Sequence, residues 1–193
     1  MLTKSVIEQV IHSQRERLEK MDSGLPRDFS GHENPGANAL IISGIRRCGK
    51  STLLQQIINS LPDPAIYLNF EDPRLAGFDL SDFNRMHEIA EQSGITLYFF
   101  DEIQEVEKWE KFVRFKLDEG YNIFITGSNA TLLSKELGTK LTGRHITKEL
   151  FPFSYGEYLR FTHQENGKES LKKYMHDGGF PEYLKTGLTD TLT

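Results

Sequence analysis

The glycine-rich stretch GIRRCGKST at residues 44–52 constrains the fold of this chain more than any other part of its sequence. Directly before it stands the unbroken apolar run ALIIS, which is typical of a strand buried on both faces. Directly after it, apolar residues at positions 53–61 recur at helical spacing, and Pro62 and Pro64 end the pattern. The sequence therefore predicts a buried strand, a tight loop and an amphipathic helix in immediate succession.

The rest of the chain repeats this alternation of apolar runs and helical patterns. Ser81 is the expected N-cap of one helix, and Ser154 with Glu157 forms a capping-box pattern at the start of another. Five strands that alternate with helices predict an α/β fold with a parallel sheet covered on both faces, in which ligands bind at the carboxyl ends of the strands. We expect strands at residues 39–43, 65–70, 95–100, 121–126 and 145–151, the last at a sheet edge, and helices at 4–21, 53–61, 81–94, 108–120, 129–138, 154–161 and 168–177.

The loop at residues 44–52 matches the pattern G-x-x-x-x-G-K-[ST], whose backbone N–H groups surround a phosphate. Its glycines permit the dihedral angles of a sharp bend, and the following helix adds partial positive charge. We expect Lys50 to reach the β- and γ-phosphates, Ser51 to bind Mg²⁺ through its hydroxyl, and Gly49 to tolerate no Cβ. A chance match is the alternative, and the flanking strand and helix argue against it. The expected nucleotide-binding residues are Gly44, Ile45, Arg46, Arg47, Cys48, Gly49, Lys50, Ser51 and Thr52.

Three side chains within this loop have a simple interpretation. Cys48 occupies a freely variable position, and no paired base is indicated that would make it a catalytic thiol. Arg46 and Arg47 are expected to face outward or toward a neighbouring subunit, where they add positive charge near the phosphates.

The stretch LYFFDEIQ at residues 97–104 supplies the carboxylates that such a loop needs. Four apolar residues lead into Asp101 and Glu102, which places both at the carboxyl end of a buried strand. We expect Asp101 to hold Mg²⁺ through water and Glu102 to orient or deprotonate the attacking water. Phosphate-loop kinases and switch GTPases usually lack a glutamate directly after the aspartate, so the pair favours ATP hydrolysis. The alternative is that both carboxylates merely cap a strand end.

Two further stretches carry candidate catalytic residues. In NIFITGSN, Ser128 is the first choice for a contact with the γ-phosphate or the lytic water, with Thr126 and Asn129 as alternatives, although Asn129 also suits a helix N-cap. In LTGRH, Arg144 is expected to reach a nucleotide bound by an adjacent protomer and to neutralise charge in the transition state. An ordinary surface arginine is the alternative for Arg144.

Composition narrows the class of protein. The chain has 193 residues, 37% of them apolar, which suits one domain with a packed core and a small appendage. A single cysteine, the lack of a signal-peptide core and the absence of a long apolar run predict a cytoplasmic protein without a membrane span. The six histidines are scattered and predict no zinc site. The net charge of −5 disfavours a domain that binds nucleic acid over its whole surface, although a local basic patch is still possible. Lys135, Lys140, Arg144 and Lys148 lie near one another in the sequence and could form such a patch, but a solvated surface is the commoner explanation for them.

Five blocks of the sequence together resemble a known family. GIRRCGKSTLL, YLNFEDPRL, LYFFDEIQEVEKWEKFVR, IFITGSNATLLSKELGTKLTGR and PFSYGEYL are similar to the prokaryotic AAA-type P-loop ATPases of the AAA_14 group, which usually carry a C-terminal DUF4143 region. The resemblance covers roughly residues 25–185. It implies an AAA+-like three-layer α/β/α core with strand order 5-1-4-3-2, ATP and Mg²⁺ as ligands, and a tendency to form homo-oligomers.

The resemblance also assigns positions and marks one departure. Lys50 and Ser51 match the Walker A motif of the family, Asp101 and Glu102 its Walker B motif, and Arg144 its G-R block. In the family, the block GGFPEYL leads into a further region of comparable size, whereas this chain stops at Thr193. We therefore expect an N-terminal helix at 1–24, a P-loop ATPase core at 25–152 and a helical extension at 153–193 that begins a truncated further region.

The leading functional hypothesis is Mg²⁺-dependent ATP binding and hydrolysis by an AAA+-type module that acts as a motor or switch. A non-catalytic ATP-binding switch is the first alternative. A P-loop small-molecule kinase is the second, and the Asp101–Glu102 pair disfavours it. A GTPase is disfavoured because no N-K-x-D motif is present to recognise guanine. The sequence identifies no protein or nucleic-acid client.

Overall fold

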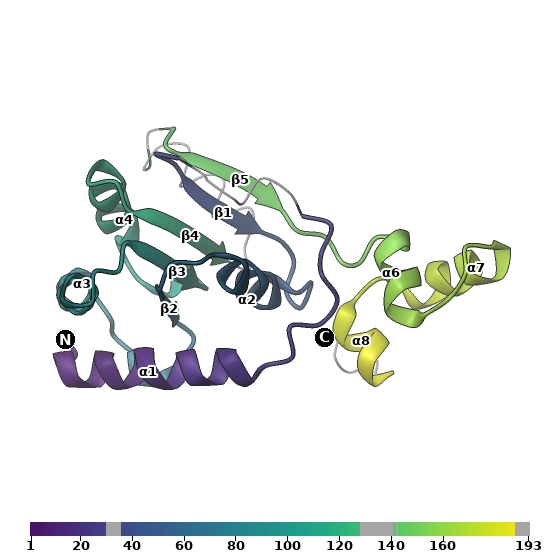
Figure 1. Ribbon diagram of the computed structural model, residues 1–193, viewed down its shortest axis with the longest axis horizontal. Helices are drawn as coiled ribbons and strands as arrows, with labels where there is room; N and C mark the ends of the chain where they lie inside the picture. Colours follow the sequence, from purple (N-terminus) through teal and green to yellow (C-terminus); the bar gives the residue numbers. More distant parts are fainter. Residues whose placement is uncertain (30–35, 128–140, 142, 188–193) are drawn as a thin grey trace.

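The computed structural model of the protein describes residues 1–29, 36–127, 141 and 143–187. An α/β core and a group of C-terminal helices lie side by side (Figure 1). In chain order the elements are α1 (Lys4–Lys20), β1 (Ala39–Ser43), α2 (Lys50–Ser60), β2 (Ala65–Asn69), the 3-10 helix η1 (Pro73–Leu75), α3 (Leu80–Gln92), β3 (Leu97–Asp101), the 3-10 helix η2 (Ile103–Glu105), α4 (Trp109–Asp118), β4 (Asn122–Gly127), β5 (His145–Glu149), α6 (Tyr155–Thr162), α7 (Lys168–Asp177) and α8 (Pro181–Thr186).

The five strands form one parallel sheet in the order β2-β3-β4-β1-β5. Read in reverse, this is the order 5-1-4-3-2 that the resemblance implies, so the fold prediction is confirmed. β5 lies at one edge, as its alternating pattern predicts. The strand β1 lies between β4 and β5, and all five of its residues are buried.

Helices cover both faces of the sheet because successive strand residues point to opposite sides. Ile41 of β1 packs in the cluster formed with α1, α3 and α4, whereas Leu40 and Ile42 pack in the cluster formed with α2. Aromatic rings fill both clusters. The rings of Phe83 and Phe112 stack with centroids 4.5 Å apart in the cluster formed with α1, α3 and α4. The rings of Phe99 and Phe124 stack with centroids 4.5 Å apart in the cluster formed with α2. The three-layer arrangement thus follows from the alternation of buried residues along each strand.

Several boundaries differ from those expected. The N-cap of α3 is Asp79 rather than Ser81, because the Asp79 carboxylate accepts hydrogen bonds from the N–H groups of Ser81 and Asp82. The strand expected at 95–100 runs instead over Leu97–Asp101, so that Asp101 itself belongs to the sheet. The helix expected at 129–138 lies outside the described residues. The short helix α8 was not expected, although Pro181 at its start and left-handed Gly187 after its end are typical helix boundaries.

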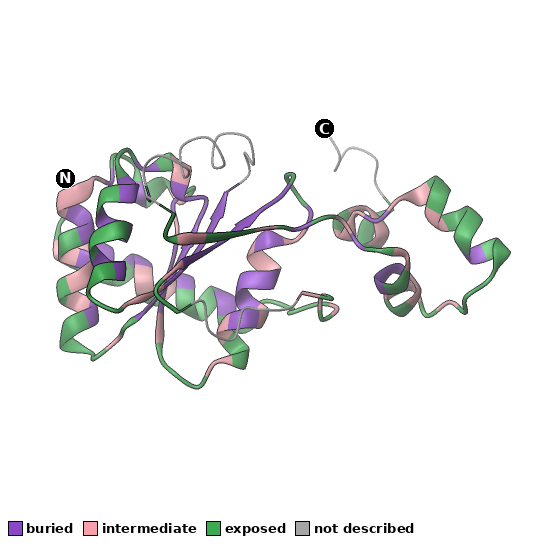
Figure 2. Ribbon diagram, turned by 90° about the horizontal axis from the view of Figure 1, so that it is seen from above, coloured by how far each residue is buried: buried purple, intermediate pink, exposed green. Residues whose placement is uncertain are grey.

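The helices α6, α7 and α8 form the C-terminal helical unit, which projects beyond the sheet on the side of the carboxyl ends of the strands (Figures 1 and 2). The capping box of α6 is confirmed: Ser154 Oγ accepts from the Glu157 N–H, and the Glu157 carboxylate accepts from the Ser154 N–H. None of the described helices is both long and apolar enough to cross a membrane. The division at residues 24 and 152 stays a prediction.

Candidate functional site

Predicted site residues that follow β1 and β3, drawn from positions 46–52 together with Glu102, border a cavity of about 480 Å³ at the carboxyl end of the sheet. One wall is formed by the start of α2 and by Glu102, and the opposite wall by the linker at 22–27 and by the C-terminal helical unit. The first wall carries the polar residues Lys50, Ser51 and Thr52. The second carries the apolar side chains of Leu25, Phe153, Phe161 and Pro181.

Backbone geometry accounts for the two glycines of the loop. Gly44 adopts a φ of 156°, and a Cβ there would lie 2.4 Å from the carbonyl oxygen of Leu150 and 3.0 Å from the sulfur of Cys48. Gly49 forms the N-cap of α2 with a φ of 101°. Both conformations strongly disfavour a side chain. The loop is therefore held tightly against the chain that follows β5.

Replacing Gly44 with alanine is expected to reduce both stability and ligand binding. The new Cβ must displace a backbone carbonyl, which costs more than the roughly 1–2 kcal/mol of an unfavourable φ alone. The measurement is thermal unfolding together with nucleotide binding. Gly77→Ala is the matched control, because Gly77 has a φ of 77° but nothing within 4 Å of the Cβ position. Equal losses of stability in the two variants would contradict the account of the loop.

Lys50 is buried beneath the loop, with an exposed fraction of only 5%. Its Nζ donates to the carbonyl oxygens of Gly44 at 3.1 Å and Ile45 at 3.2 Å, and it lies 3.8 Å from Glu102 Oε1. A buried ammonium requires such partners because desolvation of the charge is costly. Lys50 therefore connects Gly44, the first glycine of the loop, to the Glu102 carboxylate directly after β3.

Asp101 is fully buried at the end of β3 and is surrounded by hydroxyl groups. Tyr67 donates to its Oδ2 at 2.8 Å, Thr126 donates to its Oδ1, and the Ser51 side chain also bonds to it. Burial raises the pKa of Asp101, and the hydrogen bonds from Thr126, Ser51 and Tyr67 act in the opposite direction. A carboxylate beside a hydroxyl is the hard oxygen set that Mg²⁺ prefers, so Asp101 and Ser51 fit a magnesium ion.

Glu102 turns back toward the loop because its backbone is left-handed, with a φ of 53°. Its N–H donates to Thr126 Oγ1 at 3.2 Å, and its Oε2 accepts from Gln104 Nε2 at 2.6 Å. Such a conformation is unfavourable for a residue other than glycine and is retained when surrounding contacts fix it. The effect here is to direct one carboxylate oxygen toward Lys50 while Gln104 holds the other.

The residues expected after β4 are only partly described. Ser128, the first choice, and Asn129 lie outside the described residues. Thr126 is fully buried and links the Asp101 carboxylate to the Glu102 backbone N–H. Tyr67, the middle residue of β2, was missed. β2 pairs with β3 so that Asn69 lies beside Asp101, and the Tyr67 hydroxyl reaches the same carboxylate.

Arg144 does not lie at the cavity of its own chain. Its carbonyl oxygen accepts a hydrogen bond from the Ala39 N–H, at the amino ends of β1 and β5. Its guanidinium pairs with Asp118 at the end of α4. The amino ends of parallel strands lie at the edge of the sheet opposite to the loop. A role for Arg144 toward the nucleotide of an adjacent protomer stays a prediction.

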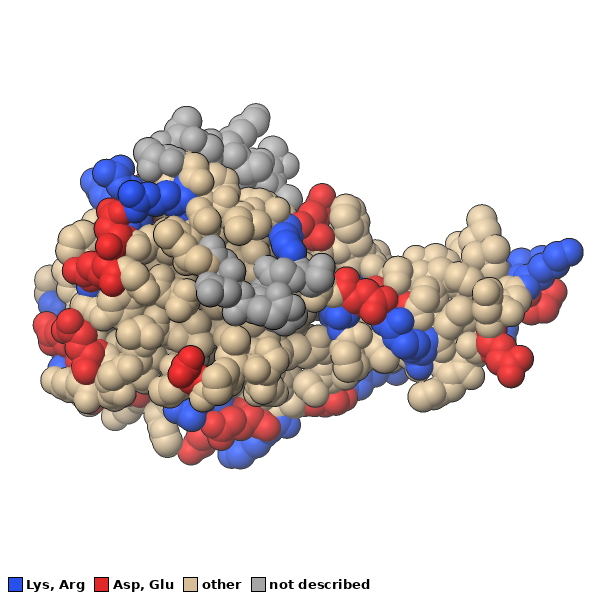
Figure 3. Space-filling view, turned by 45° about the horizontal axis from the view of Figure 1, so that its top comes forward, with Lys and Arg blue, Asp and Glu red and all other residues tan. Residues whose placement is uncertain are grey.

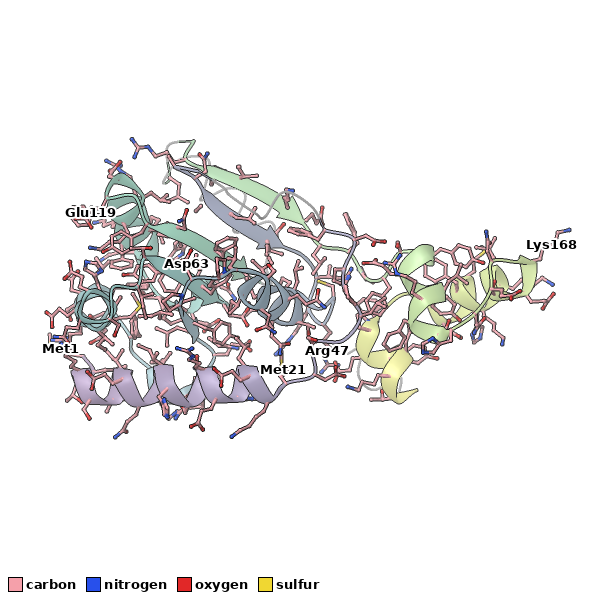
Figure 4. The ribbon with its side chains drawn as sticks, viewed as in Figure 1. Met1, Met21, Arg47, Asp63, Glu119 and Lys168 are labelled. Atoms are coloured by element: carbon pink, nitrogen blue, oxygen red, sulfur yellow. The ribbon has the colours of Figure 1, made fainter. Side chains whose placement is uncertain are left out.

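Arg46 and Arg47 line the cavity and pair with acidic residues of the same chain, and a contact with a neighbouring subunit stays a prediction. Arg46 is exposed and lies 3.8 Å from Glu71, and Arg47 lies 3.7 Å from Glu182 of α8 (Figure 4). Burial raises the pKa of the Cys48 thiol, which disfavours a reactive thiolate. Elsewhere on the face displayed in Figure 3, basic side chains lie beside acidic ones. Of the four basic residues considered for nucleic acid, Lys135 and Lys140 lie outside the described residues.

Comparison with known sequences gives one family and several relatives. The family described as "AAA domain" (AAA_14) matches residues 36–159. The uncharacterized protein MJ1544 of Methanocaldococcus jannaschii is 44% identical over 155 residues, which are 74% of this chain and 35% of that protein. An uncharacterized protein of Haemophilus influenzae is 39% identical over 158 residues, which are 75% of this chain and 40% of that protein. The chain thus spans two fifths or less of the length of these relatives.

Comparison with solved structures gives more distant similarities. DnaA from Aquifex aeolicus, bound to AMPPCP, has a TM-score of 0.48 and 16% identity over 96% of this chain and 60% of its own. The signal-transduction ATPase PH0952 from Pyrococcus horikoshii, which has a tetratricopeptide repeat sensor, has a TM-score of 0.49 and 17% identity over 86% of this chain and 31% of its own.

Proposed function

The chain belongs to the AAA domain family, and from this premise we propose that it binds ATP with Mg²⁺ at the loop of residues 44–52 and hydrolyses it. In this proposal the protein is an AAA+-type ATPase module that acts as a motor or switch. One observation carries the proposal: Lys50, Ser51, Asp101 and Glu102 come from two separate motifs and meet beside one cavity. ATP as ligand accords with the cytoplasmic location predicted from the sequence.

The phosphates would lie against the loop and the amino end of α2. Backbone N–H groups at a helix start favour an anion, and the buried ammonium of Lys50 supplies a full positive charge. On binding, Lys50 exchanges its present carbonyl partners for phosphate oxygens. The nucleoside would then extend toward Leu25, Phe153 and Phe161, where the cavity wall is apolar.

Ser51 and Asp101 would hold the magnesium ion. A magnesium ion held there would supply positive charge toward the phosphate oxygens. Asp101 acts through the orientation of its carboxylate, which the hydroxyls of Tyr67 and Thr126 fix from the protein side. Because burial disfavours its ionised form, a cation beside Asp101 lowers the cost of that charge.

Glu102 would accept a proton from the attacking water. Its Oε1 faces Lys50, and hydrogen bonds from Gln104 and to Thr126 fix the side chain and backbone of this residue. A carboxylate held in this way can orient a water molecule for attack and take its proton, as the new bond to the γ-phosphorus forms and the bond from that phosphorus to the bridging oxygen of ADP breaks. The phosphate and ADP are the products.

The direct test is phosphate release by the wild-type protein, with ATP, with and without Mg²⁺, and without an added acceptor. We expect Mg²⁺-dependent release of phosphate. Binding without turnover would favour the non-catalytic switch, and release of ADP only after addition of a small-molecule acceptor would favour the kinase. Size measurement of the same samples, with a slowly hydrolysed ATP analogue, tests for the homo-oligomer that a role for Arg144 in an adjacent site requires.

Replacing Asp101 with asparagine is expected to stabilise the free protein while it weakens Mg²⁺-dependent nucleotide binding. The raised pKa means that the folded state binds the proton of Asp101 more tightly than the unfolded state. Stability is therefore highest below the ordinary pKa of an aspartate and falls as the pH rises toward the folded-state value. Asparagine removes this cost at pH 8, where we expect Tm to rise above that of the wild type.

Thermal unfolding in the presence of a chelator measures this change. Asp63→Asn is the matched control, since Asp63 is an exposed aspartate in the loop before β2. A Tm below that of the wild type in Asp101→Asn at pH 8, without ligand, would contradict the account of Asp101 as a buried carboxylate whose ionised form is disfavoured.

A further inference from the structure

Arg27 carries a buried guanidinium at a junction of three segments. Its Nε donates to Glu157 Oε1 in α6 at 2.7 Å, its Nη1 to the carbonyl oxygen of Cys48 in the loop at 2.9 Å, and its Nη2 to the carbonyl oxygen of Phe151 at 2.7 Å. The side chains of Arg27 and Glu157 are each only 5% exposed. One rigid, planar group therefore connects the phosphate-binding loop to the first helix of the C-terminal helical unit.

The Glu157 carboxylate accepts three hydrogen bonds at this junction. Besides Arg27, the backbone N–H of Asp28 donates to it at 2.9 Å and that of Ser154 at 2.8 Å. Burial raises the pKa of Glu157, but the bonds from Arg27, Asp28 and Ser154 outweigh burial and hold this pKa below its usual range. The carboxylate is thus charged at neutral pH, and loss of either partner would leave a buried charge unpaired.

The linker that carries Arg27 is itself attached to α2, the helix that begins with Lys50. Gln56 Nε2 donates to the carbonyl oxygens of Ser23 at 2.6 Å and Leu25 at 2.9 Å, and its Oε1 accepts from the Arg27 N–H at 3.2 Å. The guanidinium also lies over the ring of Phe153, 4.9 Å from its centroid. Arg27 therefore has little freedom to move independently of α2.

The bond to Cys48 acts on the loop itself. In a trans peptide the C=O and N–H groups point in opposite directions, so the anchored carbonyl of Cys48 directs the Gly49 N–H away from the guanidinium. Gly49 is the N-cap of α2, where N–H groups are available to phosphate. Any rotation of this peptide when phosphate binds changes the hydrogen bond to Arg27, and through Arg27 the contact with Glu157.

We propose that Arg27 is a positioning residue of the nucleotide site, which fixes the Cys48–Gly49 peptide and couples phosphate binding to the placement of α6. The inference rests on the proposed function, since it requires a nucleotide at the loop. Among the described residues, the other ion pairs between core and helical unit are exposed and therefore weak: Arg160–Asp28 at 2.7 Å, Lys185–Asp22 at 3.5 Å and Arg47–Glu182 at 3.7 Å.

The test compares amide hydrogen exchange, with and without a slowly hydrolysed ATP analogue, in the wild type and in Arg27→Lys. A lysine can still pair with Glu157, but its single ammonium cannot serve Glu157, Cys48 and Phe151 in the geometry of the guanidinium. In the wild type we expect the analogue to slow exchange both in the loop and in α6. In Arg27→Lys we expect slower exchange in the loop only, with the dissociation constant of the analogue raised about tenfold, as the loss of one charge-assisted hydrogen bond predicts.

The control is Arg160→Lys, which alters an exposed ion pair on the same helix and should respond to the analogue like the wild type. If Arg27→Lys keeps wild-type affinity and wild-type protection of α6, the proposal is wrong. It is also wrong if Tm falls while the response to nucleotide is unchanged, because Arg27 would then only stabilise the fold. Failure of the wild type to bind the analogue would instead contradict the proposed function.

Glu157→Gln provides the same test if Arg27→Lys does not fold. Its amide oxygen can still accept from Arg27, while the charge of the ion pair is lost. The proposal then predicts that the analogue binds but slows exchange in α6 less than in the wild type. Full wild-type protection of α6 in Glu157→Gln would overturn the proposal.

Discussion

Replacing Glu102 with glutamine is expected to lower kcat for ATP hydrolysis by about 10²- to 10⁴-fold, the usual contribution of a general base. Glutamine has nearly the same shape and can keep the contact with Gln104, but it cannot take a proton from water. Nucleotide binding should persist, because the loop and Lys50 are unchanged. Removal of the negative charge 3.8 Å from the Lys50 ammonium should, if anything, favour the phosphates.

Phosphate release under saturating Mg²⁺ and ATP measures this effect, and a binding titration with the same variant separates catalysis from affinity. Glu105→Gln is the matched control, since Glu105 is an exposed glutamate in the same short helix η2. Unchanged hydrolysis in Glu102→Gln would overturn the role given to Glu102. If Glu102→Gln loses hydrolysis because it no longer binds ATP, the role of Glu102 would instead be to hold the loop in its binding conformation.

Replacing Lys50 with alanine is expected to weaken ATP binding by about 10- to 150-fold, which corresponds to the roughly 1.5–3 kcal/mol of a hydrogen bond to a charged group. The substitution removes the buried ammonium at the cavity, and Arg46 and Arg47 remain as the cationic side chains that line it from the loop. It also takes this donor from the carbonyl oxygens of Gly44 and Ile45 and removes the ammonium 3.8 Å from Glu102, so some loss of stability should accompany it.

A binding titration at a temperature where the variant is folded, as judged by circular dichroism, measures the loss of affinity. Lys172→Ala serves as the control, because Lys172 is a highly exposed lysine of α7 that does not line the cavity. Full retention of ATP affinity in Lys50→Ala would contradict the assignment of the loop as a phosphate site.

The sequence alone was sufficient to predict the sheet and the two motifs that border the cavity. Each strand is a short apolar run, and in a parallel sheet the residues that follow such runs meet at one edge. This is why Lys50 and Glu102, 52 positions apart, could be assigned to one site. Local boundaries were less predictable because Asp79 and Ser81 are both good N-caps, and only the structure shows that Asp79 fills this role.

The features that the sequence did not reveal depend on distant contacts or on unusual backbone. Arg27 and Glu157 are 130 positions apart and match no local motif, so their buried pair emerges only from the packing of α6. The left-handed turn at Glu102, which directs its carboxylate toward Lys50, has no signal in residue type. The location of Arg144, in contrast, could have been deduced, because a residue directly before a strand of a parallel sheet lies at the edge away from the ligand.

Direct titration of the wild-type protein with ATP, by calorimetry in the presence and absence of Mg²⁺, is the measurement that tests the central claim most directly. The account predicts one ATP bound per chain, tighter binding with Mg²⁺, and weakened binding in Lys50→Ala and, in the presence of Mg²⁺, in Asp101→Asn. A folded wild-type protein that binds no ATP under either condition would contradict the account.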